Sequence, residues 1–189
     1  MPTAAPIHAP TEENRRADAR ALVEGFRCED PAERGHREAM LALLAGPENP
    51  FARESTRDGH FTASAFVVHG GSLLLIWHRK LLRWLQPGGH VDPGDRDLQA
   101  AATRELAEET GVTGARCLGP LDLDVHPIPA NPKRGEPDHR HHDVRFLFEA
   151  PSREAVAGSD AGEVRWVRLD EVTEELTDAS VLRAVAKLR

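Results

Sequence analysis

The sequence predicts a mixed α/β or α+β domain, and three features of its patterning point to that class. Short β-rich runs recur between residues 61 and 168, and apolar residues alternate in two of them. Residues 97–110, in the middle of these runs, have helical spacing instead, and a second helical pattern closes the chain. Strands interrupted by a central helix and followed by a last helix form a sheet that helices cover. The length of 189 residues fits one such domain plus an extension.

The extension is expected at the N-terminus. Residues 1–10 are rich in proline and are expected to be a disordered tail. Residues 11–57 are expected to form two helices and a linker. The second helix has a clear start, because Asp30 is a good N-cap, Pro31 suits the first helical position and Glu33 completes a capping box. Its apolar stripe consists of His36, Met40, Leu43 and Leu44. We hypothesise that this extension mediates homodimerisation.

The domain proper is expected over residues 58–189. Its strands are expected from short β-rich runs and, over 121–126 and 143–148, from period-two alternation. Its helices are expected from caps and 3.6-residue spacing. In order, the expected elements are strands over 61–68 and 72–78, a helix over 97–110 ended by Gly111, strands over 121–126, 143–148 and 163–168, and a last helix begun by Asp178. In the strand over 121–126, Asp122, Asp124 and His126 share one face.

Composition excludes several classes of protein. The longest unbroken apolar run, residues 39–45, has seven residues, whereas a membrane-spanning helix needs about 20. The formal net charge of −7 argues against a general nucleic-acid binder, which would show a basic footprint. The two cysteines, Cys28 and Cys117, are far apart in the sequence and offer no disulfide framework, so a cytoplasmic location is the expectation.

The chemistry is expected in a glycine-rich loop followed by an acidic helix. Glu105, Glu108 and Glu109 are spaced so that a helix presents all three carboxylates on one side. At about 100° per residue, Glu105 and Glu109 continue the apolar stripe of Leu98 and Ala102. Carboxylates on such a stripe must be paired, protonated or bound to a metal, and hard divalent ions such as Mg²⁺ take oxygen ligands of this kind. The glycines of the preceding loop allow a phosphate to approach the backbone closely.

This segment, from Gly89 to Val112, resembles the Nudix box of the Nudix hydrolases, with the Arg-Glu-Leu-Ala-Glu-Glu-Thr-Gly-Val half as its most specific part. The resemblance implies a mixed β-sheet sandwiched between helices, over residues 58–189. It implies hydrolysis of a nucleoside diphosphate linked to another group X, with Mg²⁺ or Mn²⁺ as cofactor and a small nucleotide as substrate. The implied catalytic residues are Arg104, Glu105, Glu108 and Glu109; the implied metal ligands are the three glutamates and the Gly89 carbonyl.

Two departures from the box separate this chain from its family. Asp95 stands where the family has the first glutamate of the box, and eight residues instead of seven separate it from Arg104. An extra residue within the helix would rotate everything after it by about 100°. Placed in the loop over residues 95–97, it leaves the glutamate face unchanged. The loop is the favoured position, and the role of Asp95 stays open.

The general base and the substrate contacts are less defined. Glu105 is the base candidate within the box, and Glu163 and Asp143 are candidates outside it. Candidate substrate contacts are Arg79, Trp84, His126, His141 and Glu163. Trp84 precedes the glycine loop and is a candidate for stacking on a base, whereas core packing is its alternative role.

Four of the ten histidines, His126, His139, His141 and His142, fall within a proline-rich stretch. They are interpreted as a transition-metal site, as contacts to phosphate or base, or as an exposed polar loop. A zinc hydrolase and a nucleotide-sensing domain that does not hydrolyse its ligand are the alternatives to a Nudix enzyme. The absence of tyrosine weakens the dinucleoside polyphosphate class, and Pro127, fifteen residues after Val112, hints at the ADP-ribose class.

Overall fold

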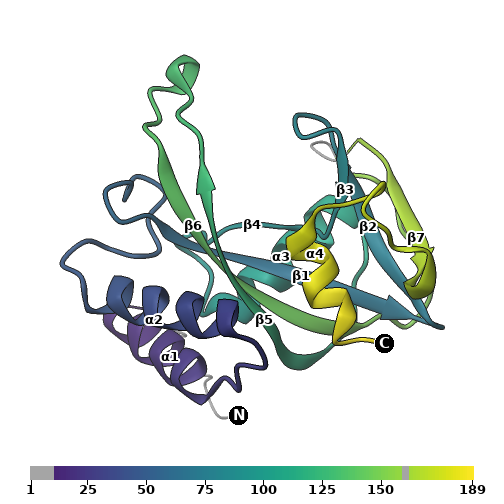
Figure 1. Ribbon diagram of the computed structural model, residues 1–189, viewed down its shortest axis with the longest axis horizontal. Coiled ribbons are helices and arrows are strands. Elements are labelled where there is room, and N and C mark those ends of the chain that lie inside the picture. Colours follow the sequence, from purple (N-terminus) through teal and green to yellow (C-terminus); the bar gives the residue numbers. More distant parts are fainter. Residues whose placement is uncertain (1–10, 159–161) are drawn as a thin grey trace, which may run out of the picture.

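The computed structural model describes residues 11–158 and 162–189 (Figure 1). The proline-rich tail expected over residues 1–10 lies outside them. The helices are α1 (Glu12–Gly25), α2 (Pro31–Ala45), α3 (Leu98–Thr110) and α4 (Ala179–Ala186), and η1 (Pro132–Arg134) and η2 (Leu169–Glu171) are single 3₁₀ turns. The strands are β1 (His60–His69), β2 (Ser72–His78), β3 (Arg83–Leu85), β4 (Gly88–His90), β5 (Arg116–Ile128), β6 (His139–Glu149) and β7 (Val164–Arg168). Within the described residues, no helix combines the length and the apolar character needed to cross a bilayer.

The strands form one mixed, seven-stranded sheet, as the fold class predicts. Its path is β3-β2-β1-β6-β5, with β4 paired to β1 and β7 paired to β2. β1 and β6 run parallel, and the other pairs are antiparallel. Two short strands, β3 and β4, have no alternation signal in the sequence, and they are strands because β2 and β1 supply their hydrogen-bond partners. β5 and β6 extend beyond the predicted runs and form a long hairpin that projects from the sheet (Figure 1).

Two apolar cores lie on the two faces of this sheet. Because side chains alternate along β1, Phe61, Ala63, Ala65 and Val67 enter the larger core with α3, α1 and α2, whereas Phe66 enters the smaller core with α4. The buried residues of α3 on the larger core include Leu98, Ala101, Ala102 and Leu106. α3 thus packs against β1 and β4, next to the glycine-rich loop.

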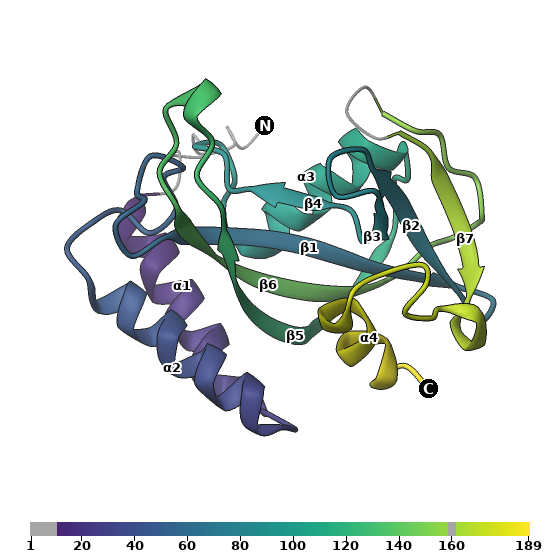
Figure 2. The same cartoon turned by 45° about the horizontal axis from the view of Figure 1, so that its top comes forward.

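The N-terminal helices pack side by side, and α2 packs against β5 (Figure 2). The predicted cap is confirmed, because the Glu33 amide donates to Asp30 Oδ1 at 2.9 Å. The Glu33 carboxylate accepts from the Glu29 amide and, fully buried, pairs with Lys187 near the C-terminus. Met40, Leu43 and Leu44 of the predicted stripe are buried in the larger core, so the chain uses this face itself. Homodimerisation stays a prediction.

A buried charge network fixes α4 to the β5–β6 hairpin. Arg145 on β6, whose side chain is 2% exposed, pairs with three aspartates, each at 3.0 Å: Asp122, Asp124 and Asp143. Arg183 of α4 adds bonds to Asp122 at 2.6 Å and to Asp124 at 2.9 Å. Each buried charge of this network has a partner of opposite sign, the condition under which buried ions are tolerated.

Candidate active site

The acidic helix begins and ends where the sequence predicts. Asp97 is the N-cap of α3 and accepts from the Ala100 amide at 2.8 Å, and Gly111 ends the helix in the left-handed conformation at φ 67°. α3 is a single uninterrupted α-helix from Leu98. The extra residue of the segment therefore lies in the loop before Leu98, as favoured from the sequence, and the glutamates keep their spacing on one helix.

The glycine pair of β4 lies directly against this helix. The Gly88 amide donates to Glu109 Oε2 at 2.9 Å. A Cβ at Gly89 would lie 2.5 Å from Glu105 Oε1, and a Cβ at Gly88 would lie 2.5 Å from Ser64 Oγ on β1. At Gly88 the close approach requires glycine, because a Cβ there would also lie 2.7 Å from Ser64 Cα and 2.8 Å from the Ala63 carbonyl oxygen. At Gly89 a side chain would instead displace the Glu105 carboxylate.

Arg104 joins the loop to the helix. Its guanidinium donates to Asp95 at 2.9 Å, to the His90 carbonyl at 2.8 Å, to Glu105 at 2.9 Å and to Glu108 at 3.0 Å. Asp95 is 7% exposed and also accepts from the Asp92 amide. Asp95 therefore closes the loop and anchors Arg104. In this arrangement Arg104 is a positioning residue, because all of its bonds orient other groups of the site.

The three glutamates of the box differ in their surroundings. Glu105 has a 15% exposed side chain, whereas Glu108 is 58% exposed and lies at the rim. Burial raises the pKa of Glu105, and its bond with Arg104 opposes that shift. For Arg104, burial works against the charged form, but the bonds to Asp95 and Glu105 outweigh it and raise the pKa above its usual range. Glu105 and Glu109 thus form the inward part of the acidic cluster predicted from helical spacing.

A cavity of about 480 Å³ opens beside the glycine pair. Its walls come from β1, β2, β4, β5 and β6, and Glu109, His126 and His141 of the predicted site are among its lining residues. Asp143 also lines it, but its carboxylate is engaged by Ser64 Oγ at 2.8 Å and by Arg145 at 3.0 Å. The Lys80 side chain adds a positive charge at the opening. The cavity thus brings a box glutamate, two predicted histidines and basic charge together.

Three predicted contact residues are not among the described residues that line this cavity. Trp84 on β3 packs against Trp77, with ring centroids 5.6 Å apart, and belongs to the border of the smaller core. Arg79 is exposed at the end of β2, and Glu163 is exposed just before β7, where its carbonyl accepts from the Trp77 amide at 2.8 Å. The packing role weighed for Trp84 matches its position.

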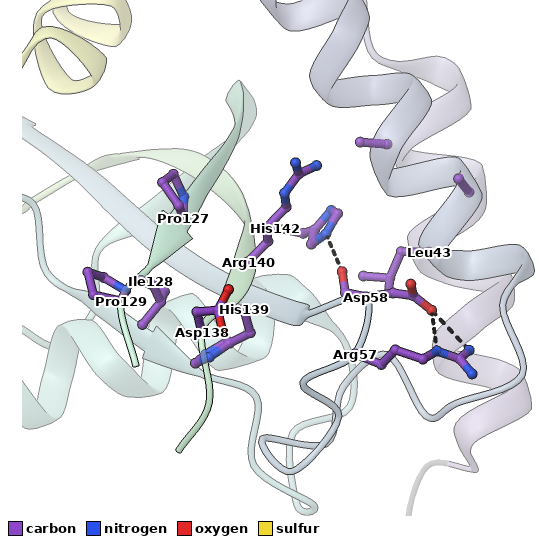
Figure 3. Close-up of a pocket in the computed structure, with 12 residues that line it drawn as sticks. Leu43, Arg57, Asp58, Pro127, Ile128, Pro129, Asp138, His139, Arg140 and His142 are labelled. Carbon is purple, nitrogen blue, oxygen red and sulfur yellow. Dashed lines mark hydrogen bonds and ion pairs between the residues drawn. The ribbon is translucent and has the colours of Figure 1, made fainter. Parts of the chain in front are cut away.

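The register between β5 and β6 decides which of the predicted histidines lie close together. β5 and β6 pair so that His126 stands opposite His141 and Asp124 opposite Asp143. His126 Nδ1 lies 2.8 Å from Asp124 Oδ2. His142 belongs to the other face, where it lines a separate hollow with Leu43 of α2 and contacts the Asp58 carbonyl at 3.2 Å (Figure 3). Histidines that are close together in the sequence therefore lie on two different faces: His141 faces the cavity and His142 faces away from it.

Two further histidines, which the sequence pattern did not single out, lie beside His141. His60 of β1 stands opposite His141 in the parallel register, and His90 follows the glycine pair on β4. The ring centroids of His60 and His141 are 4.9 Å apart, and those of His90 and His141 are 5.2 Å apart. Burial, followed by the neighbouring imidazoles, lowers the pKa of His90 to about 4 and that of His141 to about 2. Burial also lowers the pKa of His60, so all three rings are neutral near pH 7.

A mixed sheet that holds a glutamate-bearing helix against a glycine-rich strand is the arrangement expected of a Nudix domain. The NUDIX domain family model matches residues 59–187, so the chain belongs to this family. Its class is that of the Nudix pyrophosphohydrolases. The match begins at the start of β1 and leaves α1 and α2 outside it.

Individual relatives agree with the family. A Lactococcus lactis protein named "Probable DHNTP pyrophosphohydrolase" is 35% identical over 116 residues, covering 61% of this chain and 69% of that protein. A Caulobacter vibrioides RNA pyrophosphohydrolase is 39% identical over 102 residues, covering 48% of this chain and 59% of that protein. The E. coli dihydroneopterin triphosphate pyrophosphohydrolase structure has a TM-score of 0.56 at 16% identity, covering 67% of this chain and 92% of that one; this likeness concerns the fold alone.

Proposed function

We propose that this protein is a divalent-metal-dependent hydrolase that cleaves the pyrophosphate linkage of a nucleotide-like triphosphate. The observation that carries the proposal is the contact of two box carboxylates with the glycine strand at the cavity. Glu109 accepts from the Gly88 amide at 2.9 Å, and Glu105 fills the space that a side chain at Gly89 would take. The carboxylate oxygens of Glu105 and Glu109 are thus held beside the backbone of the glycine pair, which a phosphate chain can approach closely.

The donor chemistry of this site fits Mg²⁺ or Mn²⁺. Glu105, Glu108 and Glu109 offer hard oxygens, and the Gly89 carbonyl is a further candidate ligand. Arg104 is the cation that contacts Glu105 and Glu108, and it shares its charge with Asp95, so negative charge is left for a cation to neutralise. A metal bound there supplies charge neutralisation on the phosphates and a water with a lowered pKa.

The chain's own residues have separable tasks in this proposal. Water attacks phosphorus, the bond from phosphorus to the bridging oxygen breaks, and a carboxylate accepts the proton of the water. Glu105 is the proposed base, because its side chain is much less exposed than that of Glu108 and Arg104 fixes it at 2.9 Å. Asp143 is less suited, because Ser64, Thr62 and Arg145 already donate to its oxygens.

The substrate class is proposed from two sources. One relative, the Lactococcus lactis protein, is named "Probable DHNTP pyrophosphohydrolase". The cavity is lined by Lys80 and several histidines, which suit an anionic, planar substrate better than an apolar one. ADP-ribose and nucleotide sugars are the competing class, and the assay separates the two.

The proposal is tested with a substrate panel. Dihydroneopterin triphosphate, nucleoside triphosphates, oxidised dGTP, ADP-ribose and a nucleotide sugar are assayed with Mg²⁺ and with Mn²⁺, and products are separated by chromatography. Glu109→Gln and Glu105→Gln are each expected to lower kcat at least about 100-fold. Glu174→Gln, an exposed glutamate on the loop before α4, is the matched control and should retain wild-type turnover.

Two results would contradict the proposal. Turnover of Glu109→Gln within threefold of the control would remove the glutamate cluster from the mechanism. Binding of a panel member with Mg²⁺ and without product from the wild-type protein would favour the non-hydrolytic sensing domain instead.

A further inference from the structure

Three histidines from three strands converge at one end of the cavity. One ring nitrogen each of His60, His90 and His141 lies within 4.8 Å of the other two. Among the residues that the structure describes, this is the only set of three or more histidine, cysteine, aspartate or glutamate side chains whose ligand atoms come so close together. Strand register produces it, because β1 pairs with both β4 and β6.

His60 supplies an independent observation. It is 1% exposed, its Nδ1 lies 3.1 Å from the Ser55 carbonyl, and its Nε2 is buried without a hydrogen-bond partner. Because a carbonyl only accepts, Nδ1 must carry the proton, and in the neutral ring Nε2 then holds the lone pair. Metal-bound histidines are oriented in this way, with one ring nitrogen donating to a carbonyl and the other facing the ion. A buried lone pair with no other partner is costly.

We propose that His60, His90 and His141 bind one transition-metal ion of the Zn²⁺ type, at a site separate from the glutamate cluster. Imidazole nitrogens suit zinc, cobalt, nickel and copper, whereas the carboxylates of α3 suit Mg²⁺ and Mn²⁺. A tetrahedral zinc with bonds of about 2.0–2.1 Å requires nitrogens roughly 3.4 Å apart. Small rotations of the His90 and His141 rings, which make no side-chain hydrogen bond within the described part of the chain, close the gap.

The site has a direct connection to the cavity. His90 and His141 line the cavity, whereas His60 closes the site from behind. Three protein ligands leave a fourth position of a tetrahedral ion for water or for an oxygen or nitrogen of the substrate. The ion would therefore recognise the part of the substrate that extends away from the glutamates, and it would tie β1, β4 and β6 together.

Metal binding by the full chain tests the proposal. The protein is stripped with a chelator and dialysed against ZnCl₂, and bound zinc is measured by elemental analysis. A parallel titration with CoCl₂ follows the visible absorption, whose intensity reports a four-coordinate nitrogen site. We expect about one ion per chain for the wild type, and affinities at least tenfold weaker for His90→Gln and His141→Gln.

His142→Gln is the matched control, because His142 is the buried neighbour of His141 on the other face of β6. It should bind zinc like the wild type, and circular dichroism should show that all three variants are folded. An absence of zinc binding by the wild type, or equal affinity in the wild type and in both His90→Gln and His141→Gln, would overturn the proposal. Glu109→Gln should keep its zinc, so failure of the zinc site and failure of the proposed hydrolysis are distinguishable.

Discussion

Gly89→Ala isolates the contact between the glycine strand and the box glutamates. The alanine Cβ would lie 2.5 Å from Glu105 Oε1 and 2.6 Å from its Cδ, whereas ordinary contacts begin at 3.4 Å. The Glu105 carboxylate must therefore retreat by about 0.9 Å. Gly89 does not have a positive φ, so alanine meets no backbone strain there. The substitution should move one catalytic carboxylate and leave the strand in place.

The expected loss follows from that displacement. A misplacement of about 1 Å in a catalytic site costs on the order of 100-fold in rate, which corresponds to about 2.7 kcal/mol of the activation barrier. The free energy of unfolding should fall by no more than about 3 kcal/mol, the upper value for a hydrogen bond to a charged group such as that between Arg104 and Glu105. Turnover with Mg²⁺ and urea unfolding are measured on the same preparations.

Gly94→Ala is the control within the same loop, because nothing lies within 4 Å of the Cβ position at Gly94. It should retain wild-type turnover and stability. The reasoning is refuted if Gly89→Ala turns over within threefold of Gly94→Ala, since Glu105 would then work equally well from a displaced position. A loss of turnover that matches a loss of folded protein would also refute it.

Two further outcomes concern the buried charges and the cap of α3. Arg145→Met should lower the free energy of unfolding by about 3–5 kcal/mol in urea, because it leaves buried carboxylates with fewer cations. Burial alone would raise the pKa of Asp122, but its bonds with Arg183 and Arg145 outweigh burial and lower it. The stability it contributes is present above its unfolded pKa and is lost on acidification, so the deficit of Arg145→Met should shrink below about pH 4; a constant deficit would contradict this. Asp97→Ala should cost about 1 kcal/mol, and Asp97→Asn should restore the loss in the same titration; equal stability of the two variants would argue against the cap.

Much of the fold follows from local patterns. The caps Asp30, Asp97 and Asp178 start helices because each side-chain oxygen accepts an amide two or three residues later, an interaction that local sequence encodes. β1 and β2 lie where the β-rich runs predict them, with one residue more at each end of β1. β3 and β4 were missed, because they are three residues long and exist only through pairing with neighbours.

The candidate site, too, is predicted in part by local spacing and in part only by the folded structure. Helical spacing alone puts Glu105 and Glu109 on the buried side of α3, because three and four residues complete about one turn. Spacing does not separate Glu108 from the other two, although its side chain is 58% exposed in the structure. The role of Asp95 also needed the structure, since its partner Arg104 is nine residues away and reaches it only when the loop closes.

The sequence by itself determined the class of protein, because the spacing of Arg104, Glu105, Glu108 and Glu109 lies within one helix. Only the tertiary structure decided which histidines come together. His141 was singled out from a cluster in the sequence, but its partners His60 and His90 come from strands 81 and 51 residues earlier, whereas its neighbour His142 turns to the opposite face. Residues on one helix are related by its fixed geometry, whereas residues on different strands are related by register, which depends on packing of the whole sheet.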